Sequence, residues 1–89
     1  MKVEREVVVS NKEGLHFRPI MQLVDTAQRF TAKITLHCDG RAADGRSPME
    51  LLMLVAVQGA TVKMALEGPD AQDAADEIAK LFENGFGES

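Results

Sequence analysis

The spacing of apolar residues changes period along the chain, and this feature limits the fold more than any other. Residues 32–38 and 61–67 alternate apolar and polar side chains, which predicts half-buried β-strands. The valine-rich stretch 3–9 also reads as a strand. In 20–27 and 71–82, apolar residues recur at spacings of three and four, which predicts amphipathic helices. The chain therefore mixes strands and helices.

Turn signals set the order of these elements. The Asp39-Gly40 pair predicts a hairpin with a short strand at 41–43, and a short apolar helix is expected from Ser47 to about Leu54. The predicted order is β-α-β-β-α-β-α. Half-buried alternating strands imply an antiparallel sheet with one solvated face, and the helices must cover the other. We therefore predict an α+β fold, with four antiparallel strands covered on one face by three helices.

Length, charge and composition exclude several function classes. The 89 residues are enough for one domain over 1–89, with a thin core, so we expect any chemistry at the surface, completed by a partner. A formal net charge of −4 argues against nucleic-acid binding. The longest apolar run, 51–57, is too short for a membrane span of about 20 residues, and the charged first residues do not resemble a signal peptide. We expect a monomeric cytoplasmic protein without a cofactor.

Metal binding is not expected either. The chain has two histidines and one cysteine. His37 and Cys38 are neighbours in a predicted strand, so their side chains point to opposite faces and cannot bind one ion together. Cys38 is predicted in the core and His37 at the surface.

The segment 14–19, GLHFRP, carries the candidate chemistry. It lies where a loop becomes a helix, and Pro19 suits a first helical turn. His16 should therefore lie near the N-cap, with Arg18 in the first turn. Free backbone N–H groups, the helix dipole and Arg18 would all favour a phosphate on the imidazole. The same field disfavours an imidazolium, which keeps His16 nucleophilic. On spacing alone, an exposed histidine beside a solvated arginine is the simpler interpretation.

The residues around His16 resemble a known family. Residues 11–20, NKEGLHFRPI, resemble the active-site motif of HPr, the histidine-containing phosphocarrier family of the bacterial phosphotransferase system, which usually reads GLHARPA. The similarity continues through GRSPMELLML at 45–54 and QGATVKMALEGPDA at 58–71. The predicted element order also matches the family's fold, an open-faced β-sandwich.

The resemblance implies a role for each matching residue. His16 would accept a phosphoryl group on Nδ1 from enzyme I and pass it to a IIA-type domain, as a carrier and not as an enzyme. Arg18 would steady the phosphate. Ser47 would be the regulatory serine that a kinase modifies in some branches. The chain departs from the family pattern at Phe17, where a small residue is usual, and at Pro48, directly after Ser47.

Two further features concern the second helix and its surroundings. The run Ser47-Pro48-Met49-Glu50 is typical of a capping box with proline at the first helical position. In the resembled fold, the faces that carry the off-stripe apolar residues lie side by side next to the histidine. A partner-docking patch is therefore expected, for which the candidates are Phe17, Met21, Met49 and Leu52. Met21 fits a core position equally well.

Three functions remain open from the sequence. The first is a phosphocarrier that relays phosphate between proteins. The second is a regulatory relative that binds a transcription factor or an enzyme, with phosphorylation as its signal. The third is an inert interaction domain. The presence of His16 favours the first, since a purely regulatory relative could dispense with it.

Overall fold

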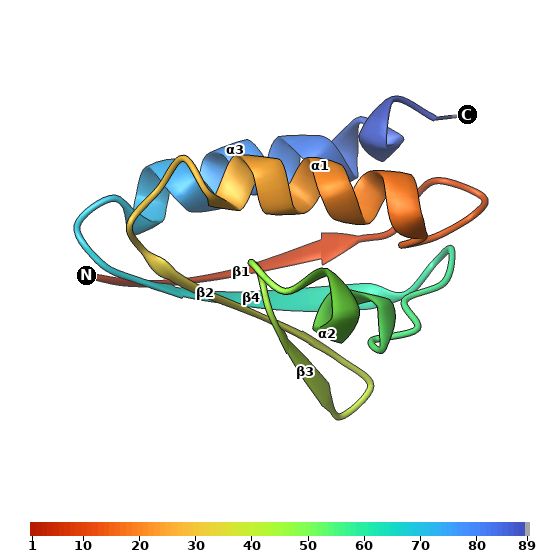
Figure 1. Ribbon diagram of the computed structural model, residues 1–89, viewed down its shortest axis with the longest axis horizontal. Coiled ribbons are helices and arrows are strands. Elements are labelled where there is room, and N and C mark those ends of the chain that lie inside the picture. Colours follow the sequence, from red (N-terminus) through yellow and green to blue (C-terminus); the bar gives the residue numbers. More distant parts are fainter. Residues whose placement is uncertain (89) are drawn as a thin grey trace.

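The computed structural model describes residues 1–88 and contains the predicted succession of strands and helices (Figure 1). A 3₁₀ turn, η1, follows the last helix. The elements are β1 (Lys2–Val8), α1 (Phe17–Ala27), β2 (Lys33–Cys38), β3 (Arg41–Asp44), α2 (Pro48–Leu52), β4 (Thr61–Glu67), α3 (Ala71–Glu83) and η1 (Gly85–Gly87).

The four strands form one antiparallel sheet in the order β1-β4-β2-β3. The register brings inward-facing residues of neighbouring strands together: Leu36 lies opposite Met64, and Val7 lies opposite Val62. The Asp39-Gly40 hairpin is confirmed, and both of its residues have positive φ angles of 49° and 79°, as a tight two-residue turn requires.

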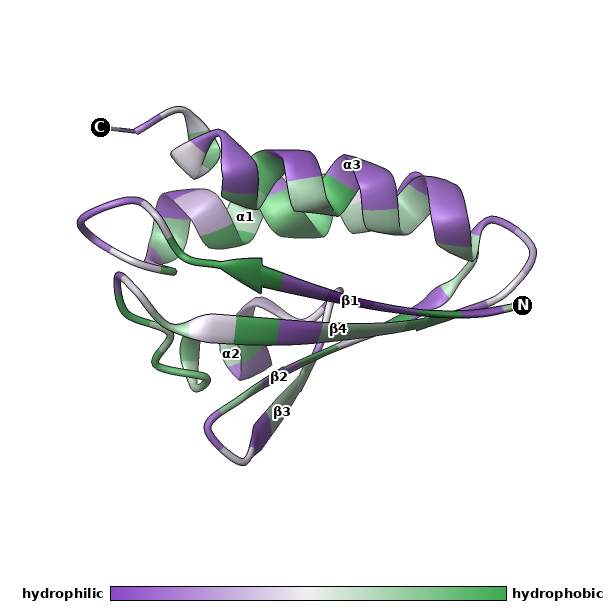
Figure 2. Ribbon diagram, turned by 180° about the vertical axis from the view of Figure 1, so that it is seen from behind, coloured by the Kyte–Doolittle hydropathy of each residue, from purple (hydrophilic) through white to green (hydrophobic). Residues whose placement is uncertain are grey.

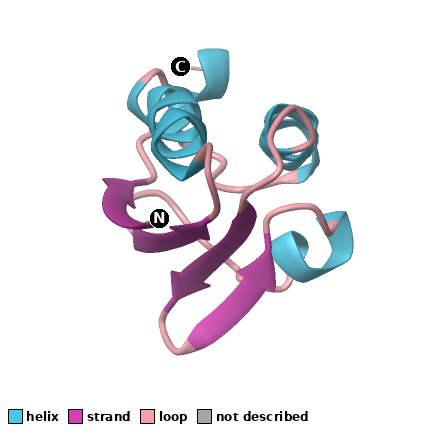
Figure 3. Ribbon diagram, turned by 90° about the vertical axis from the view of Figure 1, so that its left-hand side faces the viewer, coloured by secondary structure: helices cyan, strands magenta, loops and turns pink. Residues whose placement is uncertain are grey.

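The three helices lie on the same side of this sheet, and the other face carries none (Figure 3). The open-faced α+β architecture is therefore confirmed. In the hydropathy view, α3 shows hydrophilic residues on the surface turned away from the sheet (Figure 2). Its small residues on the opposite side let it pack closely on β1 and β4.

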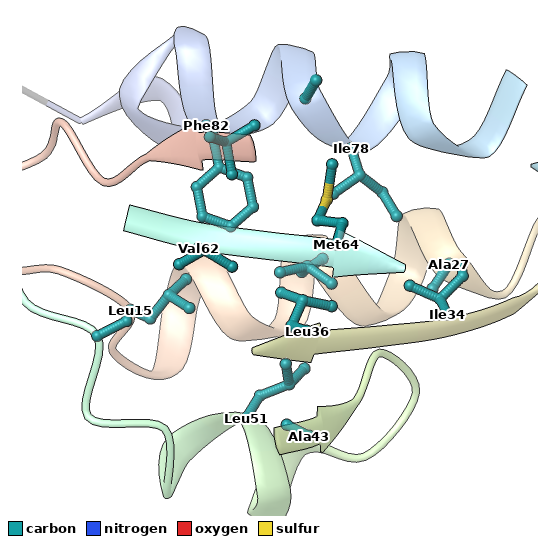
Figure 4. Packing of buried hydrophobic residues seen from close by; sticks show 14 of the residues in the cluster. Leu15, Ala27, Ile34, Leu36, Ala43, Leu51, Val62, Met64, Ile78 and Phe82 are labelled. Carbon is teal, nitrogen blue, oxygen red and sulfur yellow. The ribbon is translucent and has the colours of Figure 1, made fainter. Parts of the chain in front are cut away.

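The core lies between the sheet and the helices (Figure 4). The side chains of Ile34, Leu36 and Cys38 are at most 3% exposed, as their alternation predicted. The apolar stripe of α3 is also confirmed, except that Leu81 is only partly buried. Phe30 packs against the core just past α1. Burial of such apolar side chains is the main force that holds the helices on the sheet.

Helix α2 is shorter than predicted. It ends at Leu52, and Met53 is its C-cap. Leu54 is nevertheless fully buried, and Val55 follows with a positive φ of 51°, so the chain leaves the helix and still places Leu54 in the core. The sequence pattern could not separate this arrangement from one more helical turn, because both bury Leu51 and Leu54.

Arg46 fixes the end of α1 against the loop before α2. Its guanidinium donates hydrogen bonds to the carbonyl oxygens of Ala27, Phe30 and Ala32. The last carbonyls of a helix have no intrahelical donor, so a positive charge there also complements the helix dipole. This contact holds α1 and α2 in the relative position on which the candidate site depends.

Candidate functional site

His16 is the N-cap residue of α1, as predicted. Its backbone is extended, with φ −94° and ψ −170°, and its side chain makes no capping hydrogen bond. The carbonyl oxygen of His16 accepts the N–H of Ile20 at 3.0 Å. The imidazole is therefore left for another use, while the backbone at His16 starts the helix.

The loop before His16 is held by close packing. Gly14 has a positive φ of 68°, and a Cβ on this residue would lie 2.5 Å from the carbonyl oxygen of Ala56. The N–H of Leu15 donates to that same oxygen at 2.9 Å. Only glycine fits such a close backbone approach at this angle. The position of His16 is thus set by the contact between two loops.

The N–H groups of the first helical turn begin next to the imidazole. Those of Phe17 and Arg18 have no acceptor within the helix, and Pro19 has no N–H at all. Such a helix start favours an anion. Arg18 is exposed in the same turn, and its charge contributes to lowering the pKa of the Glu88 carboxyl. These groups make the start of α1 electropositive.

Glu88 is the site residue that the sequence analysis missed. Both oxygens of its carboxylate lie 2.9 Å from Nε2 of His16. A carboxylate can only accept, so Nε2 is the donor in this contact; in the neutral imidazole this leaves the lone pair on Nδ1. Nδ2 of Asn11 also donates to Glu88 Oε1 at 3.0 Å. No periodic pattern signals this contact, because it comes from a turn after α3.

The Glu88 carboxylate is charged at neutral pH. The hydrogen bond from His16 is the main reason why its pKa lies below the usual value, and Asn11 and the positive charges nearby act in the same direction. The expected field at His16 was that of the helix start alone, which disfavours an imidazolium. The structure adds the negative charge of Glu88 beside Nε2, which that expectation did not include.

Apolar side chains are exposed on α1 and α2. The exposed fraction is 73% for Phe17, 70% for Met49 and 55% for Leu52. Met21 is partly buried, so its exposure lies between that of a docking residue and that of a core residue. The sequence analysis did not single out three further exposed apolar residues, because they follow the helical spacing of Met49 and Leu52 only in part. These residues are Met53, Val55 and Val57. Since α1 packs against α2, we define the apolar rim as Phe17, Met49, Leu52 and Met53.

Ser47 is the N-cap of α2, and Pro48 is at its start. The Ser47 Oγ accepts the N–H of Glu50 at 3.3 Å. The reciprocal half of the predicted capping box is absent: Oε1 of Glu50 accepts the N–H of Asp44, while the N–H of Ser47 donates to the Asp44 carbonyl oxygen. The turn before α2 satisfies the Ser47 N–H and thereby frees the Glu50 carboxylate.

The remaining sequence candidates are not part of this site. Cys38 is buried, which raises the pKa of its thiol, and His37 is exposed on the other face of β2. Within residues 1–88 there is no group of three histidine, cysteine or acidic side chains placed to hold a metal ion. None of the helices in this range has the length and apolar character needed to cross a membrane.

Comparison with known proteins agrees with this geometry. The family model described as "PTS HPr component phosphorylation site" matches residues 3–84. The chain is 37% identical over 86 residues to the phosphocarrier protein HPr of Xylella fastidiosa (strain 9a5c), covering 97% of both chains. It is 36% identical over 89 residues to the phosphocarrier protein NPr of Escherichia coli (strain K12), covering 99% of both.

A solved structure gives the same result. The fold matches the crystal structure of HPr-C-His from Thermoanaerobacter tengcongensis with a TM-score of 0.93, at 34% sequence identity and 98% coverage of each chain. The family match extends over nearly the whole chain, in sequence and in fold. This chain therefore belongs to the HPr family of phosphocarrier proteins of the phosphotransferase system.

Proposed function

We propose that His16 is the phosphoryl acceptor of this phosphocarrier, that enzyme I loads it, and that a IIA-type domain unloads it in the cytoplasm. The observation that carries the proposal is the state of the imidazole. Its Nε2 lies 2.9 Å from both carboxylate oxygens of Glu88 and donates to them, so in the neutral ring the Nδ1 lone pair is the nucleophile at the start of a helix.

The surroundings of His16 suit this chemistry. When Nδ1 attacks the phosphorus of a donor phosphohistidine, negative charge must be held next to the ring. The N–H groups of Phe17 and Arg18 and the guanidinium of Arg18 can supply that stabilisation. Catalysis in such a transfer is almost entirely positioning and electrostatics, so a small exposed site suffices once a partner closes over it.

The apolar rim supplies a surface for that partner. Four large apolar side chains on two helices that pack together are exposed, which is typical of a docking surface. Covering them would exclude water from the transfer, which strengthens the electrostatic contacts and limits hydrolysis. Phe17 adds bulk directly beside His16, so its partner needs an apolar recess at this point. One copy of the chain provides all of these groups, and the carrier acts as a monomer.

Ser47 serves first as the cap of α2 in this proposal. A serine kinase that modified it would place a dianion next to Met49, and this charge would weaken docking of enzyme I. Pro48 and Glu50 both disfavour a phosphate here, because Pro48 removes a backbone donor and Glu50 adds a like charge.

A regulatory role is the second candidate. The chain is almost equally similar to an HPr and to an NPr, so the similarity does not favour one branch. In the regulatory case the same phosphorylation of His16 would change binding to a transcription factor or an enzyme, and sugar uptake would not be the end point.

The relay can be tested in two steps. The protein is phosphorylated with enzyme I and phosphoenolpyruvate, purified away from both, and mixed with a IIA-type domain. Intact masses of the two proteins should show loss of one phosphate here and gain of one on the partner. Stable phosphate on this chain, together with a phosphorylation-dependent complex, would instead support the regulatory role.

A further inference from the structure

The segment after α3 is anchored against the start of the chain. Phe86 is 3% exposed, and its ring packs edge-on against Phe82 with centroids 4.9 Å apart. The carbonyl oxygen of Phe86 accepts Nε2 of Gln22 at 3.1 Å. Phe86 has a positive φ of 55°, a conformation that needs support from its surroundings. This anchoring fixes the direction in which the chain leaves towards His16.

Glu88 is held at His16 by more than one contact. Its backbone N–H donates to the Gly85 carbonyl oxygen at 2.9 Å. Its side chain is only 19% exposed and meets Nε2 of His16 and Nδ2 of Asn11. Asn11 is itself 2% exposed and donates from the same nitrogen to the Gly14 carbonyl oxygen at 2.8 Å. These contacts hold the carboxylate in one position, and the charge of Arg18 also helps to lower its pKa.

We propose that Glu88 is a positioning residue for His16: it keeps the proton on Nε2 and stabilises the positive charge that the ring gains when Nδ1 takes a phosphoryl group. This inference rests on the proposed role of His16. Residue 88 lies outside the residues that the family model matches, so the assignment comes from the geometry alone. A carboxylate on the far nitrogen of a nucleophilic or basic histidine acts in this way in other sites.

The balance of the step shows why the contact matters. The Nδ1 lone pair forms the P–N bond, and the bond from phosphorus to the donor's leaving nitrogen breaks with its electrons. The Nε2–H stays in place, so the ring becomes a phosphoimidazolium with one positive charge. On unloading, the P–N electrons return to Nδ1 and the leaving group is a neutral imidazole. The Glu88 carboxylate faces the charged ring in both directions.

A negative charge at Glu88 also repels the phosphoryl group. That repulsion acts from the far side of the ring, at a longer distance than the 2.9 Å contact with Nε2. Arg18 and the first-turn N–H groups lie at the helix start and offset it. The net effect of Glu88 is therefore faster loading of His16, the direction in which the ring gains its positive charge.

The first test needs no partner protein. In the unphosphorylated protein at a pH where the imidazole is neutral, proton NMR should show a slowly exchanging Nε2–H of His16. Glu88→Gln and Glu88→Ala should lose or shift this signal strongly, and Glu88→Asp should recover it in part. Glu83→Gln is the control, because it removes the same charge from an exposed residue at the end of α3. An unchanged signal in Glu88→Ala would overturn the proposal.

The second test measures reactivity with phosphoramidate, a small chemical phosphoryl donor, so that it does not depend on enzyme I. Glu88→Gln should phosphorylate His16 roughly fivefold more slowly, the rate effect of losing about 1 kcal/mol of charge-assisted hydrogen bonding. Glu83→Gln should load at the wild-type rate. Equal or faster loading in Glu88→Gln would overturn the positioning role, even if enzyme I still loads His16.

Discussion

Both carboxylate oxygens of Glu88 lie 2.9 Å from Nε2 of His16, although 72 residues separate the two positions in the sequence. This contact joins the turn after α3 to the start of α1. It places a carboxylate at Nε2, and it gives the site a negative charge that the helix start alone would not have.

The contact predicts the titration of Glu88. In carbon-detected NMR, the Glu88 carboxyl should titrate below the ordinary glutamate value of about 4.3, and His16→Ala should move its pKa upward. A carboxyl whose pKa is lowered in the folded state stabilises the fold at pH values above its pKa in the unfolded chain. This contribution to stability is lost as the pH falls through the pKa of the folded state. An ordinary pKa for Glu88 in the wild-type protein would contradict the contact.

Arg18 should affect the rate of transfer but not the fold. Arg18→Ala removes an exposed charge at the start of α1, so the melting temperature should stay nearly unchanged while loading by enzyme I slows. Arg18→Lys should restore the rate only in part, because lysine cannot make two parallel hydrogen bonds to a phosphate. Stopped-flow or quenched phosphorylation assays measure this. Wild-type rates in Arg18→Ala would mean that the backbone N–H groups suffice.

Met49 tests the apolar rim. Met49→Glu should weaken binding to enzyme I by about tenfold or more, since it places a charge in a desolvated interface. The melting temperature should hardly change, because Met49 is 70% exposed. Ala42→Glu, an exposed position on the open face of the sheet, adds the same charge and should bind normally. Titration calorimetry gives the affinities, and equal binding by both variants would remove Met49 from the docking surface.

Ser47 separates capping from regulation. Ser47→Ala should cost about 0.5–1 kcal/mol in the free energy of unfolding, in the lower part of the range for N-caps. The reason is that its hydrogen bond to the Glu50 N–H is long, at 3.3 Å. Urea unfolding measures the cost. Ser47→Asp keeps an acceptor at the cap and adds charge beside the apolar rim. Slower loading at unchanged stability supports a switch, whereas unchanged loading leaves Ser47 as a cap only.

Much of this fold follows from local patterns. The alternation in 61–67 predicted that Val62, Met64 and Leu66 face the core, and all three are buried. The Gly14–Pro19 segment predicted the N-cap position of His16. These features depend on residues close together in the sequence, where period and turn chemistry are informative.

The missed features depend on contacts between distant segments. Glu88 reaches His16 only because Phe86 packs on Phe82 and turns the chain with a positive φ. Sequence patterns do not predict a positive φ at a residue other than glycine, asparagine or aspartate. The end of α2 at Leu52 leaves no trace in the apolar pattern, because one more helical turn would bury Leu51 and Leu54 as well. Tertiary packing decided both, so no local pattern could have predicted them.

The most direct measurement is the intact mass of the protein after incubation with enzyme I and phosphoenolpyruvate. The account predicts a gain of one phosphate that is lost in acid, is absent from His16→Ala, and is retained when the exposed histidine is changed in His37→Ala. A phosphate that persists on His16→Ala, or a wild-type protein that gains none from an enzyme I active on another HPr, would contradict the assignment of His16 as the acceptor.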